Sequence, residues 1–159
     1  LSTFVTLSPV PGFRKWLEAE RRAESSAVLS AADRKALEKL DDTGWAETAE
    51  RREELAGVLA PLGAYYLLAA RTPKGAPVDP VARFHLGNGA RLERVNPMGD
   101  LSAKGIAQAA GLMVNYRYVP ADIEKNHEAF AGKGEIVASA NVRKLVKVDT
   151  ASSALVPVT

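Results

Sequence analysis

Apolar and polar residues alternate in three short stretches of the chain, which is the spacing of a β-strand with one buried face. The clearest stretch is 111–119, and 4–7 and 91–96 are shorter. One face of the longest stretch carries Leu112, Val114, Tyr116 and Tyr118, and the other carries Met113, Asn115, Arg117 and Val119. We therefore expect three strands, of which the last is the most clearly patterned.

Helical spacing, with apolar residues three and four positions apart, covers much of the remaining chain. It predicts helices at about 13–29, 30–40, 43–71, 80–87, 101–110, 121–130 and 135–147. The candidate N-terminal caps are Ser30 with Asp33, Asp42 or Thr43, Asp79 and Asp100. Pro61 falls inside the third helix and should kink it or start a new one, while Glu47 and Arg51 have the spacing of an ion pair.

The elements indicate one domain over residues 1–147, with a flexible tail at 148–159. Residues 13–71 form a helical region whose charged faces are typical of solvent-exposed helices, so we expect no chemistry there. A loop at 72–80, rich in proline, separates it from the following helix.

Composition narrows the possible partners. The 159 residues are 47% hydrophobic, so the chain can bury a core. It has 21 basic and 19 acidic residues and no cluster of basic residues of the kind that binds nucleic acid. It has no cysteine, and its two histidines lack metal-ligand spacing, so we expect no metal. No apolar run approaches the roughly 20 residues of a membrane span. We expect a soluble cytoplasmic protein.

The amino terminus suggests a longer polypeptide. The chain begins with Leu1 and enters its first strand almost at once, with no secretory signal before it. We interpret it as the carboxyl-terminal piece of a larger protein.

Two positions are candidates for chemistry. His85 lies on a short helix that begins after Asp79 and ends at Gly87-Asn88-Gly89, and it shares a face with apolar residues. An imidazole beside apolar surface can act as a general acid or base, although a structural core histidine has the same pattern. Ser8 lies in a turn with two prolines and a glycine, where serine most often serves as a turn or cap residue. His127, among charged residues, is expected to face solvent.

Several blocks of the chain resemble malonyl-CoA decarboxylase. Residues 82–96, 102–105 and 111–118 resemble the carboxyl-terminal part of that family, and 135–139 with Val142-Arg143 resemble its last helix. Leu7-Ser8-Pro9-Val10-Pro11-Gly12-Phe13 resembles the segment that carries the family's catalytic serine. Together the blocks cover the chain to about Lys147.

The resemblance implies an α+β or α/β fold, the second half of a GNAT-like acyl-CoA-binding domain with 13–71 as a helical insertion. It implies decarboxylation of malonyl-CoA to acetyl-CoA and CO2, with Ser8 polarising the substrate and His85 protonating the enolate carbon. His85 stands where acyltransferases of this fold often have a tyrosine. Asn88 and Tyr116 are further candidate substrate contacts, although an asparagine in a turn more often bonds the turn backbone and a tyrosine on a strand face more often belongs to the core.

The implied chemistry needs no cofactor, because the substrate's own thioester accepts the electrons. A loop for the CoA phosphates is not recognisable in the chain and is expected upstream of Leu1. The family also forms homo-oligomers, so an assembly larger than a monomer is expected. The alternatives are a non-catalytic acyl-CoA-binding or assembly fragment of the same ancestry and, with less support, acyl transfer.

Overall fold

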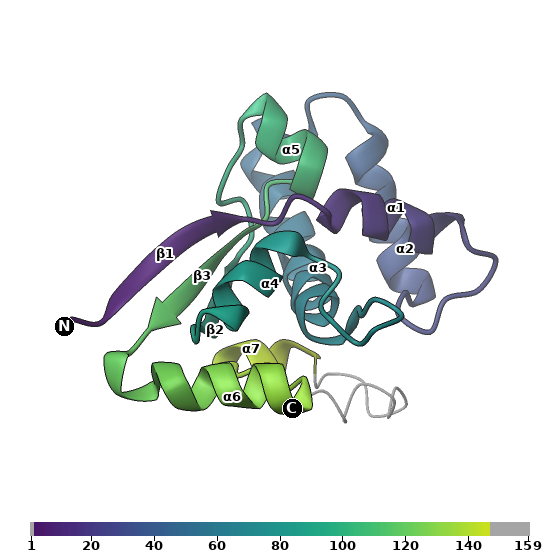
Figure 1. Ribbon diagram of the computed structural model, residues 1–159. Coiled ribbons are helices and arrows are strands. Elements are labelled where there is room, and N and C mark those ends of the chain that lie inside the picture. The colour runs from purple at the N-terminus through teal and green to yellow at the C-terminus, as the bar shows by residue number, and fades with distance from the viewer. Residues whose placement is uncertain (1, 147–159) are drawn as a thin grey trace.

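The three predicted strands form one antiparallel sheet in the computed structural model, which describes residues 2–146. The strands are β1 (Phe4–Pro9), β2 (Arg91–Asn96) and β3 (Met113–Tyr118), and they pair in the order β1-β3-β2. The last strand therefore lies between the first two, as Figure 1 shows for β1 and β3. β1 is an edge strand of this sheet, and its register places Thr6 opposite Tyr116 and Ser8 opposite Val114.

One face of β3 belongs to the hydrophobic core, as its alternation predicts. Val114, Tyr116 and Tyr118 are buried, whereas Met113 and Asn115 on the other face are only half-buried. The core continues into the helices through the buried side chains Phe13, Leu17, Leu55, Leu59, Leu67, Leu86 and Val142. Sheet and helices therefore share one core.

The first predicted helix is shorter than expected. α1 (Phe13–Arg22) ends seven residues before the predicted position, because Ser26 organises the next turn. The Ser26 hydroxyl accepts the backbone N–H groups of Val28 and Leu29 at 3.0 and 3.1 Å. A serine that bonds nearby backbone in this way competes with the helix.

The next two helices test the cap predictions. α2 (Ala31–Leu37) has the predicted capping box of Ser30 and Asp33, and it continues into a 3₁₀ turn, η1 (Glu38–Asp41). The caps predicted at Asp42 and Thr43 are wrong. A turn and a second 3₁₀ segment, η2 (Trp45–Glu47), intervene before α3 (Ala49–Ala69), because Trp45 is drawn into the core.

Of the two alternatives predicted at Pro61, a new helix start is wrong and a kink stays a prediction. α3 continues through Pro61, since buried leucines on both sides of the proline hold the helix in place although one backbone hydrogen bond is lost. The expected pair of Glu47 and Arg51 does not form. Instead, the Arg51 guanidinium donates to Asp42 at 3.0 Å.

The remaining helices are α4 (Pro80–Gly87), α5 (Ala103–Ala109), α6 (Ile123–Lys133) and α7 (Ala140–Val146), with a 3₁₀ turn η3 (Pro120–Asp122) before α6. Asp79 caps α4 as predicted, but Ser102 rather than Asp100 caps α5. The helix expected from residue 135 begins only at Ala140.

Residues 135–139 are extended because they pair with the outer edge of β2. The Leu92 N–H donates to the Val137 carbonyl at 2.8 Å, and the Ser139 N–H donates to the Leu92 carbonyl at 2.9 Å. α7 then packs beside α3 and β2, and α6 lies along the same end of the molecule (Figure 1). The predicted tail at 148–159 lies outside the described residues, so the domain boundary at 147 stays a prediction.

Candidate active site

Ser8 and His85, 77 residues apart in the sequence, meet at the boundary between the sheet and α4. The Ser8 Oγ lies 3.2 Å from the His85 Nε2, within hydrogen-bonding distance. Ser8 is 4% exposed and His85 is half-buried. The two residues that the sequence singles out for chemistry are therefore in direct contact.

The turn after β1 fixes the position of Ser8. The strand alternation turns Thr6 and Ser8 toward the same face, and β1 ends at Pro9, after which the Phe13 N–H closes a turn on the Val10 carbonyl at 3.1 Å. Gly12 is needed here, because a Cβ at this position would lie 2.5 Å from the Tyr66 hydroxyl.

α4 positions His85 from the other side. Its first turn is capped by Asp79, whose Oδ2 accepts the Ala82 N–H at 2.9 Å, and Pro80 opens the helix. The helix ends just after His85, where the N–H groups of Asn88 and Ala90 bond the His85 carbonyl. A short, capped helix therefore holds the imidazole over the sheet.

Aromatic side chains fix the imidazole ring. It stacks on Tyr116 with ring centroids 4.5 Å apart, and its Nδ1 lies 2.5 Å from the Tyr118 hydroxyl. Burial lowers the pKa of His85 below its ordinary value, because the charged imidazolium is disfavoured away from water. A neutral ring bears one N–H, and a Tyr118 hydroxyl that donates to Nδ1 leaves that N–H on Nε2, toward Ser8.

Sequence reasoning missed two members of this group, Tyr118 and Thr6. Tyr116 and Tyr118 share a face of β3, and only the register shows that the Tyr118 hydroxyl reaches the imidazole while the Tyr116 hydroxyl is buried without a hydrogen-bond partner. The Thr6 Oγ1 lies 2.9 Å from the Ser8 Oγ. The sequence feature that could have indicated Thr6 is its position two residues before Ser8, on the same face of the strand.

The other residues predicted to contact a substrate do not join the contact between Ser8 and His85. Asn88 is exposed at the carboxyl end of α4, and Tyr116 presents its ring rather than its hydroxyl to His85. Their contact with a substrate stays a prediction. His127 is exposed, as expected, and its Nδ1 donates to the Gly87 carbonyl at 2.7 Å.

Three buried polar groups lie in the core near the site. Among the described residues, the Asp79 Oδ1 and the hydroxyls of Tyr66 and Tyr116 have no hydrogen-bond partner. Burial raises the pKa of Asp79, and burial together with the nearby Asp79 carboxylate raises the pKa of both tyrosines. The tyrosines therefore remain protonated at neutral pH.

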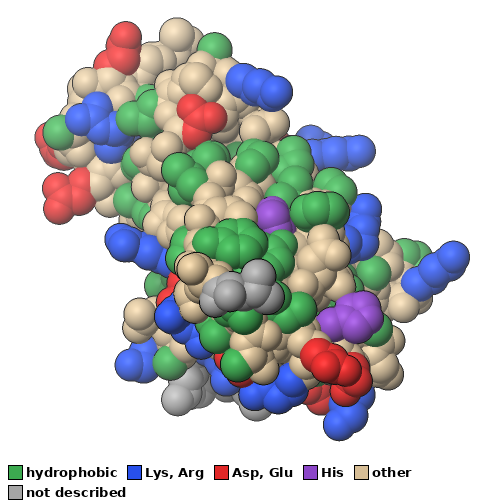
Figure 2. Space-filling view, turned by 60° about the vertical axis from the view of Figure 1, so that its left-hand side comes forward, with side chains coloured by type: hydrophobic (Ala, Val, Ile, Leu, Met, Phe, Trp, Pro, Cys, Tyr) green, Lys and Arg blue, Asp and Glu red, His purple; other side chains and the backbone are tan. Residues whose placement is uncertain are grey.

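The surface around the site is apolar. Phe4, Val5, Leu7 and Phe84 are the large hydrophobic side chains most exposed among the described residues, and they lie on β1 and α4. Figure 2 shows hydrophobic side chains gathered around a histidine at the centre of one face, with Lys and Arg toward its edges. Such a patch is typical of a surface that contacts another part of a protein or a ligand.

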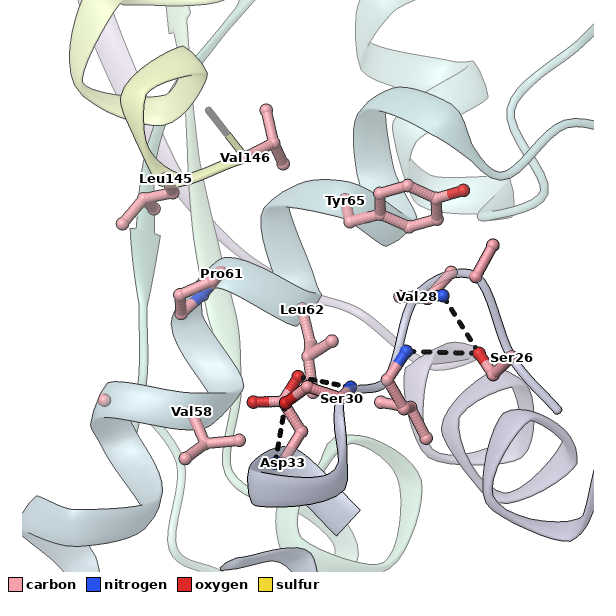
Figure 3. A pocket seen from close by; sticks show the side chains of 13 residues that line it. Ser26, Val28, Ser30, Asp33, Val58, Pro61, Leu62, Tyr65, Leu145 and Val146 are labelled. Carbon is pink, nitrogen blue, oxygen red and sulfur yellow. Dashed lines mark hydrogen bonds between the residues drawn. The ribbon is translucent and has the colours of Figure 1, made fainter. Parts of the chain in front are cut away.

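A separate pocket of about 490 Å³ lies between the loop before α2, the middle of α3 and the end of α7. Figure 3 shows its apolar wall of Val58, Pro61, Leu62, Leu145 and Val146. Ser30 and Asp33 in its wall are engaged in the capping box of α2, and Ser26 bonds the backbone of the preceding loop. It contains neither Ser8 nor His85, and no chemistry is evident in it.

Within residues 2–146 no group of acidic or histidine side chains could hold a metal ion. No helix in the same range is both long and apolar enough to cross a membrane.

The sheet order, with the last strand between the first two, and the site where β1 meets α4 define the second half of a GNAT-like fold. The chain belongs to the malonyl-CoA decarboxylase family, because the model of the malonyl-CoA decarboxylase C-terminal domain matches residues 1–156. This finding confirms the resemblance seen in the sequence.

Individual relatives agree. Mitochondrial malonyl-CoA decarboxylases from Anser anser anser and Rattus norvegicus are 37% and 35% identical over 92% of this chain, which covers 32% and 33% of their length. The malonyl-CoA decarboxylase structure from Rhodopseudomonas palustris matches with a TM-score of 0.88 and 55% identity, over 90% of this chain and 33% of that one. The structure from Agrobacterium vitis matches with a TM-score of 0.86 and 54% identity, over 92% and 36%. The chain thus spans about a third of the length of these relatives.

Proposed function

We propose that this chain is the carboxyl-terminal part of a malonyl-CoA decarboxylase and carries its Ser8–His85 pair. The observation that supports the proposal is the 3.2 Å contact of these two side chains inside a domain of that family. The reaction converts malonyl-CoA and a proton into acetyl-CoA and CO2.

The substrate supplies its own electron sink. When the bond between the carboxylate carbon and the α-carbon breaks, its electron pair moves into the thioester carbonyl and forms an enolate. A proton then adds to the α-carbon and gives the acetyl group. The protein has to orient the carboxylate, stabilise the enolate oxygen and deliver that proton.

His85 is placed for the proton transfer. Its Nε2 lies beside Ser8, and its Nδ1 contacts the Tyr118 hydroxyl. As the Nε2 proton moves to the α-carbon, the Tyr118 hydroxyl can pass its own proton to Nδ1, so that the ring stays neutral and the negative charge of the enolate ends on the Tyr118 oxygen, which then regains a proton from water. Ser8 hydrogen-bonds the substrate and polarises it.

One edge of the sheet fits a further segment of protein. Among residues 2–146, β1 has no partner on its outer side and carries the exposed side chains Phe4, Val5 and Leu7, which fit a neighbouring strand of the same polypeptide. We propose that an upstream segment covers this edge and supplies the loop for the CoA phosphates. Assembly into homo-oligomers and a cytoplasmic location remain predictions, and the animal relatives are mitochondrial by name.

The experiment replaces each member of the pair in the full-length protein and follows the release of acetyl-CoA. His85→Asn and Ser8→Ala should each lower kcat by about 10²–10⁴, the usual effect of losing general acid–base catalysis. His127→Asn is the matched control, because it changes the other histidine, which is exposed, and should leave the rate unchanged.

Two outcomes would contradict the proposal. If the folded His85→Asn protein decarboxylates malonyl-CoA at the parent rate, His85 does not carry the proton. If the parent binds malonyl-CoA but never releases CO2, the alternative of a non-catalytic acyl-CoA-binding protein is correct.

A further inference from the structure

Thr6 is a polar residue of the site and lies on the same face of β1 as Ser8. Valine has nearly the same shape and a high preference for strands, so strand preference alone does not require a hydroxyl at this position. The Thr6 hydroxyl lies 2.9 Å from the Ser8 Oγ, and Ser8 also contacts the His85 Nε2.

The Thr6 side chain is held in place from the neighbouring strand. Its Oγ1 accepts the backbone N–H of Tyr116 at 3.3 Å, and its carbonyl accepts the Asn115 side-chain amide at 2.9 Å. One lone pair of the hydroxyl is therefore occupied. Its proton and its second lone pair remain to serve Ser8.

We propose that Thr6 is a positioning residue. It keeps the Ser8 hydroxyl within hydrogen-bonding distance of the His85 Nε2 both before and after Nε2 gives up its proton. The inference rests on the proposed decarboxylation and adds a residue to it. While Nε2 carries its proton, it donates to Ser8, and the Ser8 hydroxyl donates to Thr6. After Nε2 has given its proton to carbon, the Ser8 hydroxyl donates to Nε2, and the Thr6 hydroxyl donates to Ser8.

A threonine hydroxyl suits both arrangements because it donates and accepts equally well. The oxygen atoms stay where they are, and only hydroxyl protons turn. Without Thr6, the Ser8 hydroxyl in the first arrangement loses its acceptor and the serine side chain is free to adopt other staggered positions.

The test compares Thr6→Val, Thr6→Ser and Thr43→Val in the full-length protein. Thr6→Val keeps shape and strand preference but removes the hydroxyl, Thr6→Ser restores the hydroxyl, and Thr43→Val makes the same chemical change at an exposed turn. Thr6→Val should lower kcat about tenfold with KM within about twofold, as expected for one lost orienting hydrogen bond. Thr6→Ser should return to within about threefold of the parent.

A second readout does not depend on turnover. Nitrogen-15 NMR of the histidine rings should show a changed Nε2 signal for His85 in Thr6→Val and an unchanged one in Thr6→Ser and Thr43→Val. An unchanged Nε2 signal in Thr6→Val, or an equal loss of kcat in Thr6→Ser and Thr6→Val, would overturn the role of Thr6. If the parent protein shows no decarboxylation at all, the proposed function fails, and the NMR comparison still decides whether Thr6 orients Ser8.

Discussion

At the scale of single residues, the imidazole of His85 is held by its neighbours rather than by its helix alone. The ring stacks on Tyr116, meets Phe84 and Tyr118 edge-on, and contacts Ser8 and Tyr118 through its two nitrogens. This enclosure fixes the ring plane and also removes water from it. The first effect aims Nε2 at Ser8, and the second lowers the pKa of His85.

The pKa of His85 is measurable by selective histidine labelling and NMR titration of the protein. The midpoint should lie below 6.5, because burial disfavours the imidazolium. Phe84→Ala, which removes a largely exposed ring from the edge of the imidazole, should move the midpoint up toward 6.5 by admitting water. A midpoint above 6.5 in the parent would show that a negative charge, not burial, dominates the site.

The same shift has a consequence for stability. The unfolded chain binds the proton of this histidine more tightly than the folded one, so stability should fall as pH drops through 6.5 toward the folded-state pKa. His85→Asn should lack this part of the pH dependence.

The sequence predicts only part of this residue set. Ser8 and His85 follow from resemblance to a family, since a serine in a turn and a histidine on an apolar face have ordinary structural explanations. Tyr116 and Tyr118 cannot be told apart by alternation, because both lie on the buried face of β3. Thr6 has a signal in the sequence, since it lies two residues before Ser8 on one strand, but only the structure shows its hydroxyl 2.9 Å from the Ser8 Oγ.

At the scale of elements, β1 and its turn determine where Ser8 lies. The turn passes so close to α3 that a Cβ at residue 12 would lie 2.5 Å from the Tyr66 hydroxyl, a buried group with no hydrogen-bond partner among the described residues. Tyr66 cannot easily yield, because its ring packs against Phe13 and Trp16. The turn can therefore pack this closely against α3 only because residue 12 has no side chain.

Gly12→Ala should lower the free energy of unfolding by about 1–3 kcal/mol, the usual cost of overpacking a tight site. Adding Tyr66→Phe should recover most of that loss, since it removes the oxygen that the new methyl group would meet. Gly132→Ala is the control, because nothing lies within 4 Å of a Cβ there, and alanine in that helix should stabilise by about 0.5–1 kcal/mol. Denaturant unfolding measures all three. Equal changes in the free energy of unfolding for Gly12→Ala and Gly132→Ala would contradict the close packing of residue 12 against Tyr66.

Strands were more predictable than helix ends, for physical reasons. The alternation on β3 and the Asp79 cap involve residues close together in the chain, so both can be predicted from the sequence. The segment with Trp45 before α3 and the extended residues 135–139 depend on groups distant in the chain, which local spacing cannot reveal. The early end of α1 has a local cause in Ser26, but the spacing of apolar residues does not show it.

At the scale of the whole molecule, the site lies at an exposed apolar face beside a strand edge that no other strand of the described residues covers. The chain spans about a third of the length of its relatives. We propose that the remaining polypeptide and the CoA moiety lie against the surface around Ser8 and His85. In the proposed mechanism these residues transfer the proton, and binding energy from the rest of CoA orients the thioester above them.

A serine beside a histidine could also support hydrolysis of a thioester, with the serine as nucleophile. The two reactions differ in the bond that breaks. Decarboxylation leaves the thioester intact and forms a new carbon–hydrogen bond, whereas hydrolysis releases free CoA and malonate.

The most direct test is to incubate the full-length protein with malonyl-CoA in D2O and analyse the products by mass spectrometry. The account predicts CO2 and acetyl-CoA with one deuterium in the methyl group, after correction for exchange of the substrate's own methylene protons without protein. His85→Asn should suppress this product about 10²–10⁴-fold. Free CoA and malonate as the products, with no labelled acetyl-CoA, would contradict the account.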